Sequence, residues 1–240
     1  MKESMLSPKT RYSLIVPCFN EIDSLRILIP KLVELIRIKS NLEVLILDNG
    51  STDGSTSLIK QVITQYGEIR IRTIRKEENL GYGSGLKFAI LECQSEIIIW
   101  THGDLQCDPH DVIKAIEIYE SSNNQSVVKG FRRKRSILEW MVSTTLTLAN
   151  YVINGIWIRE INAQPNLVPN CKTLLTGPDD STFEINILTK LMLEKKKIIR
   201  FDVFFPKREF GVGFNEGISN KIRYIKSCIR AIKTLRNGEK

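Results

Sequence analysis

The segment "EVLILDNGSTDGS", residues 43–55, joins an apolar, β-branched run directly to a turn made of Asp, Asn, Gly, Ser and Thr. A short apolar run bounded by turn residues predicts a buried strand. Similar runs are "YSLIVP" (12–17), "IRIRTI" (69–74) and "EIIIWT" (96–101). Helical spacing of apolar residues follows over 23–38, 55–66, 84–93 and 109–121. This alternation predicts an α/β fold with a doubly wound, mostly parallel sheet covered by helices.

The charge of the chain is concentrated at one end. The formal charge is +8, and residues 190–240 hold 14 Lys+Arg against 5 Asp+Glu, whereas residues 1–189 hold 21 against 22. No apolar run approaches the roughly 20 residues that span a bilayer, and "MKESMLSPKTR" at the start lacks an apolar signal core. We therefore expect a cytoplasmic protein with a near-neutral body and a basic end.

A polar cluster follows each of the first four predicted strands. The clusters are "PCFNE" (17–21), "DNGSTDGS" (48–55), "ENLGYGSG" (78–85) and "HGDLQCDP" (102–109). The carboxyl ends of parallel strands share one edge of an open sheet, and ligands bind in the crevice there. The topology therefore predicts that all four clusters converge on one site.

Two of these clusters allow more than one interpretation. Asp48 stands at a strand tip, which favours a ligand-binding role, whereas Asp53 equally fits a turn that caps the next helix. The glycines at 81, 83 and 85 do not have the spacing of a dinucleotide fingerprint. They are compatible with a flexible helix entry near phosphate groups.

The segment "HGDLQ" suggests a metal site. In an extended backbone, residues 102, 104 and 106 would lie on one side, because side chains alternate. The oxygens of Asp104 and Gln106 suit Mg²⁺ or Mn²⁺, and the imidazole of His102 suits Mn²⁺ better. The alternative is an ordinary polar turn.

Taken in order, the four clusters resemble the landmarks of family 2 glycosyltransferases, whose GT-A fold is a nucleotide-sugar-binding α/β domain. The resemblance is closest to the dolichyl-phosphate mannose synthase-like branch, in which the signature continues as "DLQ" with a nearby Pro, as in 104–109. It covers about residues 12–130 clearly, and "FPKREFGVG" (205–213) more weakly resembles a later Arg-x-x-Gly segment.

The resemblance implies a role for individual residues. It implies that Asp48 contacts the base, that Asp104 and Gln106 hold a divalent metal, and that Arg132 and Arg208 meet donor or acceptor phosphates. The residues expected to border the donor are Pro17, Phe19, Glu21, Gly50, Asp53, Gly81 and Asp104.

Two departures from the family pattern stand out. His102 replaces the usual first Asp of the metal signature, so whether it ligates the metal, hydrogen-bonds the donor or marks a lost metal dependence stays open. "GVGF" replaces the Gly-x-Ser-Lys that often follows the late arginine. The Gln-x-x-Arg-Trp signature of processive synthases is missing, which argues against a polymerising enzyme.

We therefore predict an enzyme that moves a sugar from a nucleotide-diphosphate sugar to a polyprenyl phosphate or a lipid-linked glycan, in cell-surface glycan biosynthesis. The resemblance implies Mg²⁺ or Mn²⁺ assistance and inversion. One alternative is transfer to a hydroxyl of a polysaccharide, with Asp180 or Asp179 as base, although either residue also fits a helix N-cap. Another is a nucleotide-sugar-binding protein without catalysis.

The basic end has helical spacing. Isoleucines at 218, 222, 225, 229 and 232 recur among lysines and arginines, which predicts a basic amphipathic helix over 217–240. It either lies on a membrane surface or packs on its own domain. Nucleic acid is not expected as a partner, because no aromatic-rich module accompanies the charge. We expect a single domain over 1–240, with a donor half at 12–130 and an acceptor-side half at 131–216.

Overall fold

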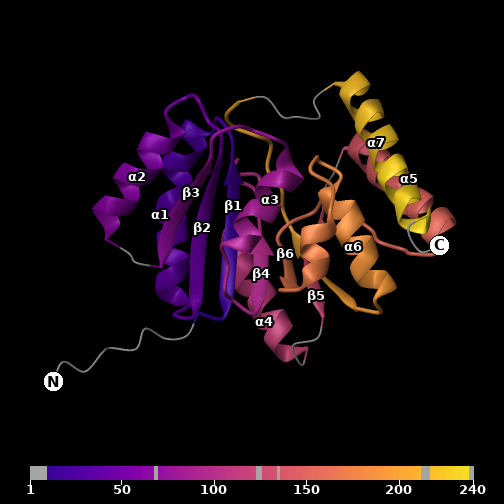
Figure 1. The fold of residues 1–240 in the computed structure, drawn as a ribbon, viewed down its shortest axis with the longest axis horizontal. Coiled ribbons are helices and arrows are strands. Elements are labelled where there is room, and N and C mark those ends of the chain that lie inside the picture. The colour runs from indigo at the N-terminus through magenta and orange to yellow at the C-terminus, as the bar shows by residue number, and fades with distance from the viewer. Residues whose placement is uncertain (1–9, 68–69, 123–125, 134–135, 212–216, 238–240) are drawn as a thin grey trace.

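A computed structural model describes residues 10–67, 70–122, 126–133, 136–211 and 217–237. Within these ranges, seven strands form one sheet in the order β3-β2-β1-β4-β6-β5-β7 (Figure 1). The strands are β1 (Tyr12–Cys18), β2 (Leu42–Asn49), β3 (Ile71–Lys76), β4 (Ile97–Trp100), β5 (Val127–Arg132), β6 (Asn166–Pro169) and β7 (Ile198–Val203). All are parallel except β6, which runs antiparallel to both neighbours. The predicted α/β fold with a mostly parallel sheet is confirmed.

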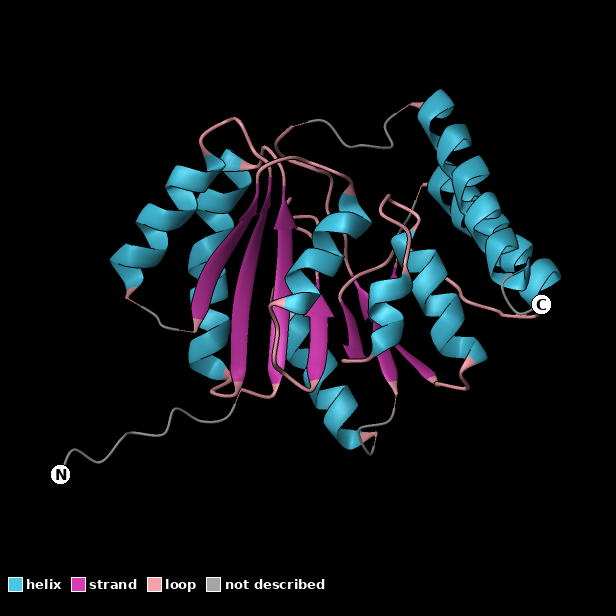
Figure 2. Ribbon diagram, in the orientation of Figure 1, coloured by secondary structure: helices cyan, strands magenta, loops and turns pink. Residues whose placement is uncertain are grey.

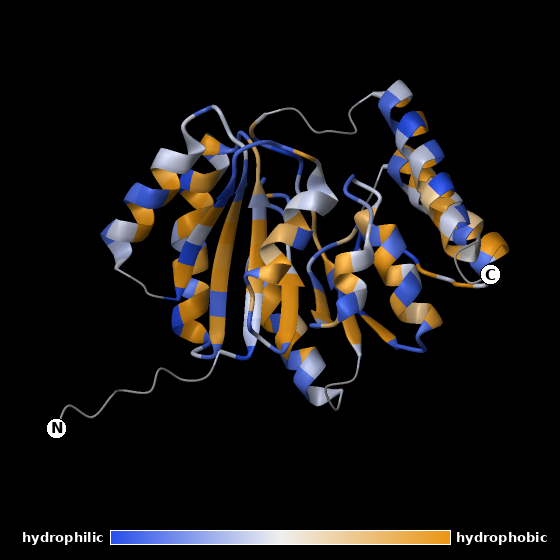
Figure 3. Ribbon diagram, viewed as in Figure 1, coloured by the Kyte–Doolittle hydropathy of each residue, from blue (hydrophilic) through white to orange (hydrophobic). Residues whose placement is uncertain are grey.

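Helices cover both faces of the sheet (Figure 2). They are α1 (Ile22–Ile38), α2 (Ser55–Tyr66), α3 (Tyr82–Leu91), α4 (Asp111–Ser121), α5 (Ile137–Asn154), α6 (Phe183–Leu193) and α7 (Ile218–Asn237). Strand alternation sorts the core, because Leu14 and Val16 pack with α1 and α4 whereas Ile15 packs with α3 and α6. Figure 3 shows the resulting hydrophobic strands between the helical layers.

The strand order creates a crevice at one edge of the sheet. The chain runs outward from β1 to β2 and β3, then returns to place β4 on the other side of β1. The carboxyl ends of β1 and β4 therefore form a topological switch point, where ligands bind in open α/β sheets. None of the described helices is both long and apolar enough to cross a lipid bilayer.

The chain after β4 contains two elements, one strand and one helix, that the sequence pattern did not predict. Strand β6 lies within "NAQPNLVPNC", where two prolines obscure the strand signal. Helix α5 begins with a capping box formed by Ser136 and Glu139 and ends at Gly155, whose φ is +70°. Residues 134–135, which follow Arg132 and Arg133 in the basic sequence "RRKR" (132–135), lie outside the described residues.

A buried lysine holds the backbone beside β6. Lys129 on β5 has no exposed surface, and its ammonium group donates to the carbonyl oxygens of Gly130, Glu160 and Ala163. Burial lowers the pKa of Lys129 to about 7. Three carbonyl acceptors satisfy the three N–H groups of the ammonium, so Lys129 fixes the approach to β6 from inside the fold.

Candidate functional site

The loops after β1 and β2 are joined by hydrogen bonds. The amide of Asn20 donates to the Ser51 hydroxyl at 3.0 Å, and the amide of Thr52 donates to the Asn20 side-chain oxygen at 2.8 Å. Asp53 accepts from the amide of Ile22 at 3.0 Å, at the start of α1. It also accepts from the amide and hydroxyl of the residue that begins α2. The Asp53 carboxylate is therefore engaged in holding the two loops together.

Asp48 lies beneath these loops with no exposed surface. Its oxygens accept from the amide of Ser51 at 2.9 Å, from the Thr56 hydroxyl, and from Arg75 at 2.6 Å. Burial opposes ionisation of Asp48, but these hydrogen bonds outweigh it and lower its pKa. Within the structure Asp48 anchors the loop and presents no free carboxylate to a ligand. The sequence analysis did not identify Arg75 as the partner of Asp48, although a basic residue near the end of a predicted strand could have suggested such an ion pair.

The loop after β4 is not the extended segment expected from sequence. Leu105 has a φ of +62°, and the Asp104 carboxylate accepts from the amide of Gln106 at 3.1 Å, which forms a tight turn. The Gln106 amide group donates to the carbonyl of Pro206 at 3.3 Å. The His102 ring lies 6.3 Å from the ring of Tyr82. The expected strand-like alternation of residues 102, 104 and 106 is therefore wrong, because the backbone bends over residues 103–107 and Leu105 is left-handed.

Arg208 joins the loops after β1 and β4. Its guanidinium donates to Asp104 at 2.9 Å and pairs with Glu21 at the start of α1. Its Nε donates to the carbonyl of Phe210 at 2.6 Å, which orients the group. Burial raises the pKa of Glu21 despite the hydrogen bonds from Ser24 and Arg208. The sequence reasoning named these three ionic residues separately, and the fold brings them into one cluster.

The metal ligands proposed from sequence form an incomplete shell. No three His, Cys, Asp or Glu side chains gather as a metal site in the described residues. Asp104 supplies one carboxylate, which accepts from the backbone amide of Gln106 and from Arg208, and His102 stands two positions before it in the sequence. Mg²⁺ is commonly bound by one or two carboxylates together with substrate phosphates. This donor set therefore fits a divalent ion that arrives with a diphosphate.

The N-terminus of α3 is covered by the segment 178–180. The amide of Gly83 donates to the carbonyl of Asp180 at 3.2 Å, and the amide of Ser84 donates to the carbonyl of Asp179 at 2.8 Å. A Cβ at Gly81 or Gly83 would overlap backbone carbonyl oxygens of this segment. These glycines therefore permit close backbone packing, and the helix entry does not offer its free amides to phosphate as the sequence suggested.

The side chains of the two candidate bases have local partners. Asp179 pairs with Lys87 at 2.8 Å. Asp180 accepts from the amide of Thr182 at 2.8 Å and from its hydroxyl at 2.5 Å, just before α6 begins. The Asp180 carboxylate therefore closes a turn just ahead of α6, whose N-cap is Thr182, so the N-cap role expected for Asp180 is not observed.

Glu184 on α6 connects the two halves of the sheet. One of its oxygens accepts from Trp100 Nε1 at 3.0 Å, from the Tyr82 hydroxyl at 2.9 Å, and from the Gln164 amide group. Glu184 is buried, and it is the acceptor for Trp100 and Tyr82, whereas the Gln164 amide group also donates to the Tyr82 hydroxyl at 2.9 Å. Sequence reasoning missed this residue because its partners are 20 to 102 positions away.

A cavity of about 520 Å³ lies where β5 meets α5. Arg132 borders it and pairs with Glu160 at 3.0 Å, with its guanidinium 5.2 Å from the Phe205 ring. Arg159 also borders it and stacks 5.0 Å from the Phe131 ring. Among the described residues, no carboxylate lies within ion-pair distance of Arg159. Arg159 therefore offers a cation that sequence reasoning did not identify.

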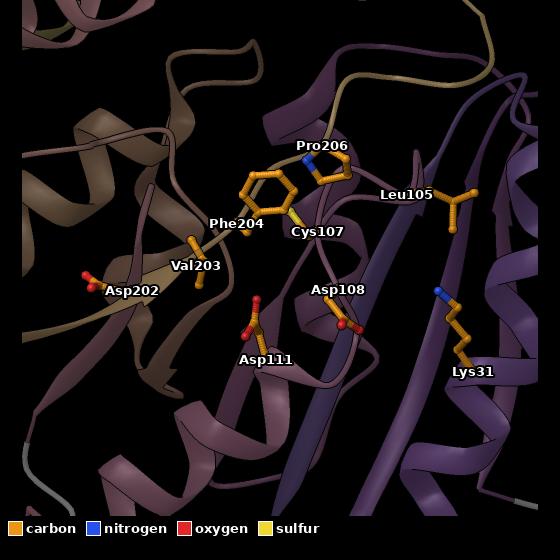
Figure 4. A pocket seen from close by; sticks show the side chains of 9 residues that line it. All are labelled: Lys31, Leu105, Cys107, Asp108, Asp111, Asp202, Val203, Phe204 and Pro206. Carbon is orange, nitrogen blue, oxygen red and sulfur yellow. The ribbon is translucent and has the colours of Figure 1, made fainter. Parts of the chain in front are cut away.

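A second cavity, of about 410 Å³, lies between α1, the start of α4 and the end of β7 (Figure 4). Asp108 and Asp111 line it, together with Phe204 and Pro206 of the segment that leads to Arg208. Burial, with the nearby Asp108, raises the pKa of Asp111 to about 6. No residue that we assigned to the donor lines this cavity, so we do not place the donor there.

The sequence pattern that defines glycosyl transferase family 2 matches residues 13–173, about two thirds of the chain. The chain belongs to glycosyl transferase family 2. Among curated relatives of this family 2 protein is the undecaprenyl-phosphate 4-deoxy-4-formamido-L-arabinose transferase of Pectobacterium atrosepticum, 25% identical over 212 residues. The match covers 86% of this chain and 63% of that relative. An Aeromonas hydrophila protein of the same name is 27% identical over 139 residues, which cover 58% of this chain and 41% of that one.

Solved structures support the same fold for this family 2 protein. Glucosyl-3-phosphoglycerate synthase from Mycobacterium tuberculosis, in complex with UDP, superposes with a TM-score of 0.72 at 18% identity, over 94% of this chain and 79% of that chain. The same enzyme with Mn²⁺, UDP-glucose and phosphoglyceric acid gives 0.72 at 17% identity, over 93% and 80%. The GT-A fold implied by the sequence clusters is confirmed.

Proposed function

We propose that this chain transfers a sugar from a nucleotide-diphosphate sugar to a polyprenyl phosphate or lipid-linked glycan during cell-surface glycan synthesis, with inversion at the transferred carbon. The observation that carries the proposal is the Glu21–Arg208–Asp104 cluster at the switch point of a family 2 fold. The names of the curated relatives support the acceptor class, because those proteins act on undecaprenyl phosphate. The match covers only 63% of the Pectobacterium atrosepticum protein, so we propose the acceptor class for this chain and do not take it over from that name.

Donor binding is assigned to the crevice between β1 and β4. Pro17 lies near the end of β1, and Phe19 and Gly50 lie on the loops that follow β1 and β2. Phe19 is 44% exposed, which leaves its ring available to a nucleoside. Asp48 and Asp53 would act by fixing these loops, since both are occupied by hydrogen bonds.

Asp104 and Gln106 would hold Mg²⁺ or Mn²⁺, with His102 as a candidate third ligand. Support comes from the mycobacterial enzyme, whose structure contains Mn²⁺ with UDP-glucose. The ion, when bound, neutralises negative charge that develops on the departing diphosphate. Arg208 already stands beside Asp104, so its guanidinium can move from the carboxylate to a phosphate oxygen while Glu21 keeps it oriented.

Acceptor binding is assigned to the cavity between β5 and α5. Arg132 and Arg159 supply positive charge there. An acceptor phosphate is already anionic and needs no strong base, whereas a hydroxyl acceptor would need one. The contacts of Asp180 with Thr182 favour a structural role for this carboxylate and hence the phosphate acceptor. We place the reaction at the inner face of the membrane, where lipid-linked acceptors are accessible to a cytoplasmic enzyme.

Transfer assays on the purified chain test the proposal. UDP-, GDP- and dTDP-sugars are offered with undecaprenyl phosphate and Mn²⁺ or Mg²⁺, and the lipid product is measured by chromatography. We expect one donor to give product, and Asp180→Asn to retain turnover. Loss of turnover in Asp180→Asn, with unchanged nucleotide affinity, would favour a hydroxyl acceptor. Binding of a nucleoside diphosphate without transfer of any sugar would indicate a non-catalytic binding protein.

A further inference from the structure

Helix α5 exposes an apolar face. Ile137 is 80% exposed and Val152 is 77% exposed, and further large apolar side chains on this helix are also exposed, namely Leu138, Trp140, Met141, Leu148 and Tyr151. Positions 137, 141, 148 and 152 share one side of a helix. The only charged residue of α5 is Glu139. Solvated helix faces carry charge, so a contiguous apolar face of this kind marks an interaction site.

Helix α7 packs beside α5 (Figure 1). Its sequence supplies basic residues, which we call the basic rim. Tyr224, Cys228 and Ile232 form its buried face, and the backbone carbonyl of Ile232 accepts from Asn154 of α5 at 3.2 Å. The exposed positions include four cations: Arg223, Lys226, Arg230 and Lys233. No Asp or Glu occurs between residues 218 and 237. The buried face of α7 thus packs on its own domain, while its charge faces solvent next to α5.

We propose that the apolar face of α5 and the basic rim of α7 together dock the protein on an anionic lipid bilayer. The apolar side chains would enter the interface between headgroups and acyl chains, and each basic residue near the surface contributes about 1 kcal/mol of attraction. Trp140, Tyr151 and Trp157 are the residue types enriched at bilayer interfaces, and the rings of Tyr151 and Trp157 are 5.6 Å apart.

Charge favours a bilayer over a second copy of this chain. A two-fold dimer through α5 would bring the same patch of each copy together, and with it two basic rims that repel each other. An anionic lipid surface complements the same rim.

The docking surface is continuous with the acceptor cavity. Ile137 and Trp140 at the start of α5 also line that cavity, together with Arg132, Arg133 and Arg159. Docking through α5 would therefore hold the cavity mouth at the bilayer surface, where the headgroup of a lipid-linked acceptor lies. In this respect the inference rests on the proposed function, although lipid binding is measured independently of activity.

Co-sedimentation of the full chain with vesicles tests the docking surface. We expect binding to phosphatidylcholine vesicles that contain phosphatidylglycerol, and weaker binding to phosphatidylcholine alone. Replacing Met141, Leu148 and Val152 together by Ser should lower the vesicle partition coefficient about tenfold or more, because three side chains lose their apolar contact. Replacing Arg223, Lys226 and Arg230 by Gln should remove the preference for phosphatidylglycerol.

The matched control replaces two other exposed apolar residues by Ser: Ile38 at the end of α1, which is 56% exposed, and Leu91 at the end of α3, which is 68% exposed. It should bind vesicles as the unmodified chain does, and circular dichroism should show that every variant is folded. Unchanged sedimentation of the α5 variant would overturn the inference. The inference would also be overturned by two results together: light scattering shows a dimer that the α5 substitutions dissociate, and the unmodified chain does not bind vesicles.

Transfer to a short-chain, water-soluble polyprenyl phosphate separates this inference from the proposed function. The α5 variant should keep that transfer while losing vesicle binding. Vesicle binding through α5 without transfer to any acceptor would contradict the proposed function alone.

Discussion

The part of the fold from β1 to α4, to which we assign donor binding and which we call the donor half, uses buried polar groups differently from the part from β5 to α7. We assign acceptor binding to that second part and call it the acceptor half. In the donor half these groups lie at the carboxyl edge of the sheet, where Asp48 and Asp53 tie loops to each other. In the acceptor half they lie within the scaffold, where Lys129 and Glu184 each serve three partners. The comparison indicates that buried polar groups hold the loops of the donor half in place around a site. In the acceptor half, buried Lys129 and Glu184 hold irregular segments of the chain in position.

Asp104→Asn gives the largest expected effect and tests the donor half. Loss of the carboxylate removes the metal ligand and the partner of Arg208, so we expect kcat/KM to fall about 100-fold or more. Some loss of thermal stability is also expected, because Asp104 is buried and pairs with Arg208, so the kinetics are measured well below the melting temperature of the variant. Steady-state kinetics with the preferred donor measure the effect, and activity within about twofold of the unmodified chain would show that Asp104 holds no essential metal.

Lys129→Ala tests the acceptor half. It leaves the carbonyl of Ala163 without the Lys129 donor, removes one of two donors to the carbonyl of Glu160 and opens a cavity, so the unfolding free energy should fall by about 3 kcal/mol. Urea denaturation followed by circular dichroism measures it. The exposed Lys226→Ala is the control and should change stability by less than about 0.5 kcal/mol. An equal effect of the two changes would mean that Lys129 is not a structural ion.

Gly83→Ala tests the junction between the halves. The new Cβ would overlap the carbonyl of Pro178 and displace the segment that covers α3, so we expect a loss of about 2 kcal/mol in unfolding free energy. Gly67→Ala is the control, since nothing lies within 4 Å there and only its φ of +63° is unfavourable. The control should cost about 1 kcal/mol, the lower end of the range for a residue with a Cβ in the left-handed conformation. A Gly83→Ala protein as stable as the unmodified chain would show that the junction is not closely packed.

Asp111→Asn gives the smallest expected effect, and it depends on pH. The native pKa of Asp111 is about 6, above the ordinary value of about 4 for an aspartate. The unfolded chain therefore releases this proton first, and folding is penalised as pH rises from 4 to 6. We expect Asp111→Asn to stabilise the protein by about 1 kcal/mol at pH 7, after allowance for solvent screening, and by less at pH 5. Chemical denaturation at both pH values measures the difference, and a constant gain would exclude this titration.

The donor half was the part most accessible to sequence reasoning. Each of its strands is an apolar run followed by a polar cluster, and parallel topology forces those clusters to one edge. The roles of the clustered residues were less accessible. The ion pair between Asp48 and Arg75 depends on strand register, which places them opposite each other on β2 and β3. The left-handed conformation of Leu105 could not be predicted from the sequence either, because leucine seldom adopts this conformation.

The sequence by itself determined the α/β class, the four converging clusters and the family resemblance. These features follow from the spacing of apolar residues within short segments and from the order of the motifs, both of which can be read without the structure. Only the tertiary structure decided that β6 inserts between β4 and β5, and that Arg208 reaches Asp104 from 104 positions away. It also decided which face of α7 is buried and that α5 carries the exposed apolar face. These features depend on contacts between segments distant in sequence, whose pairing follows from packing and charge in three dimensions rather than from local pattern.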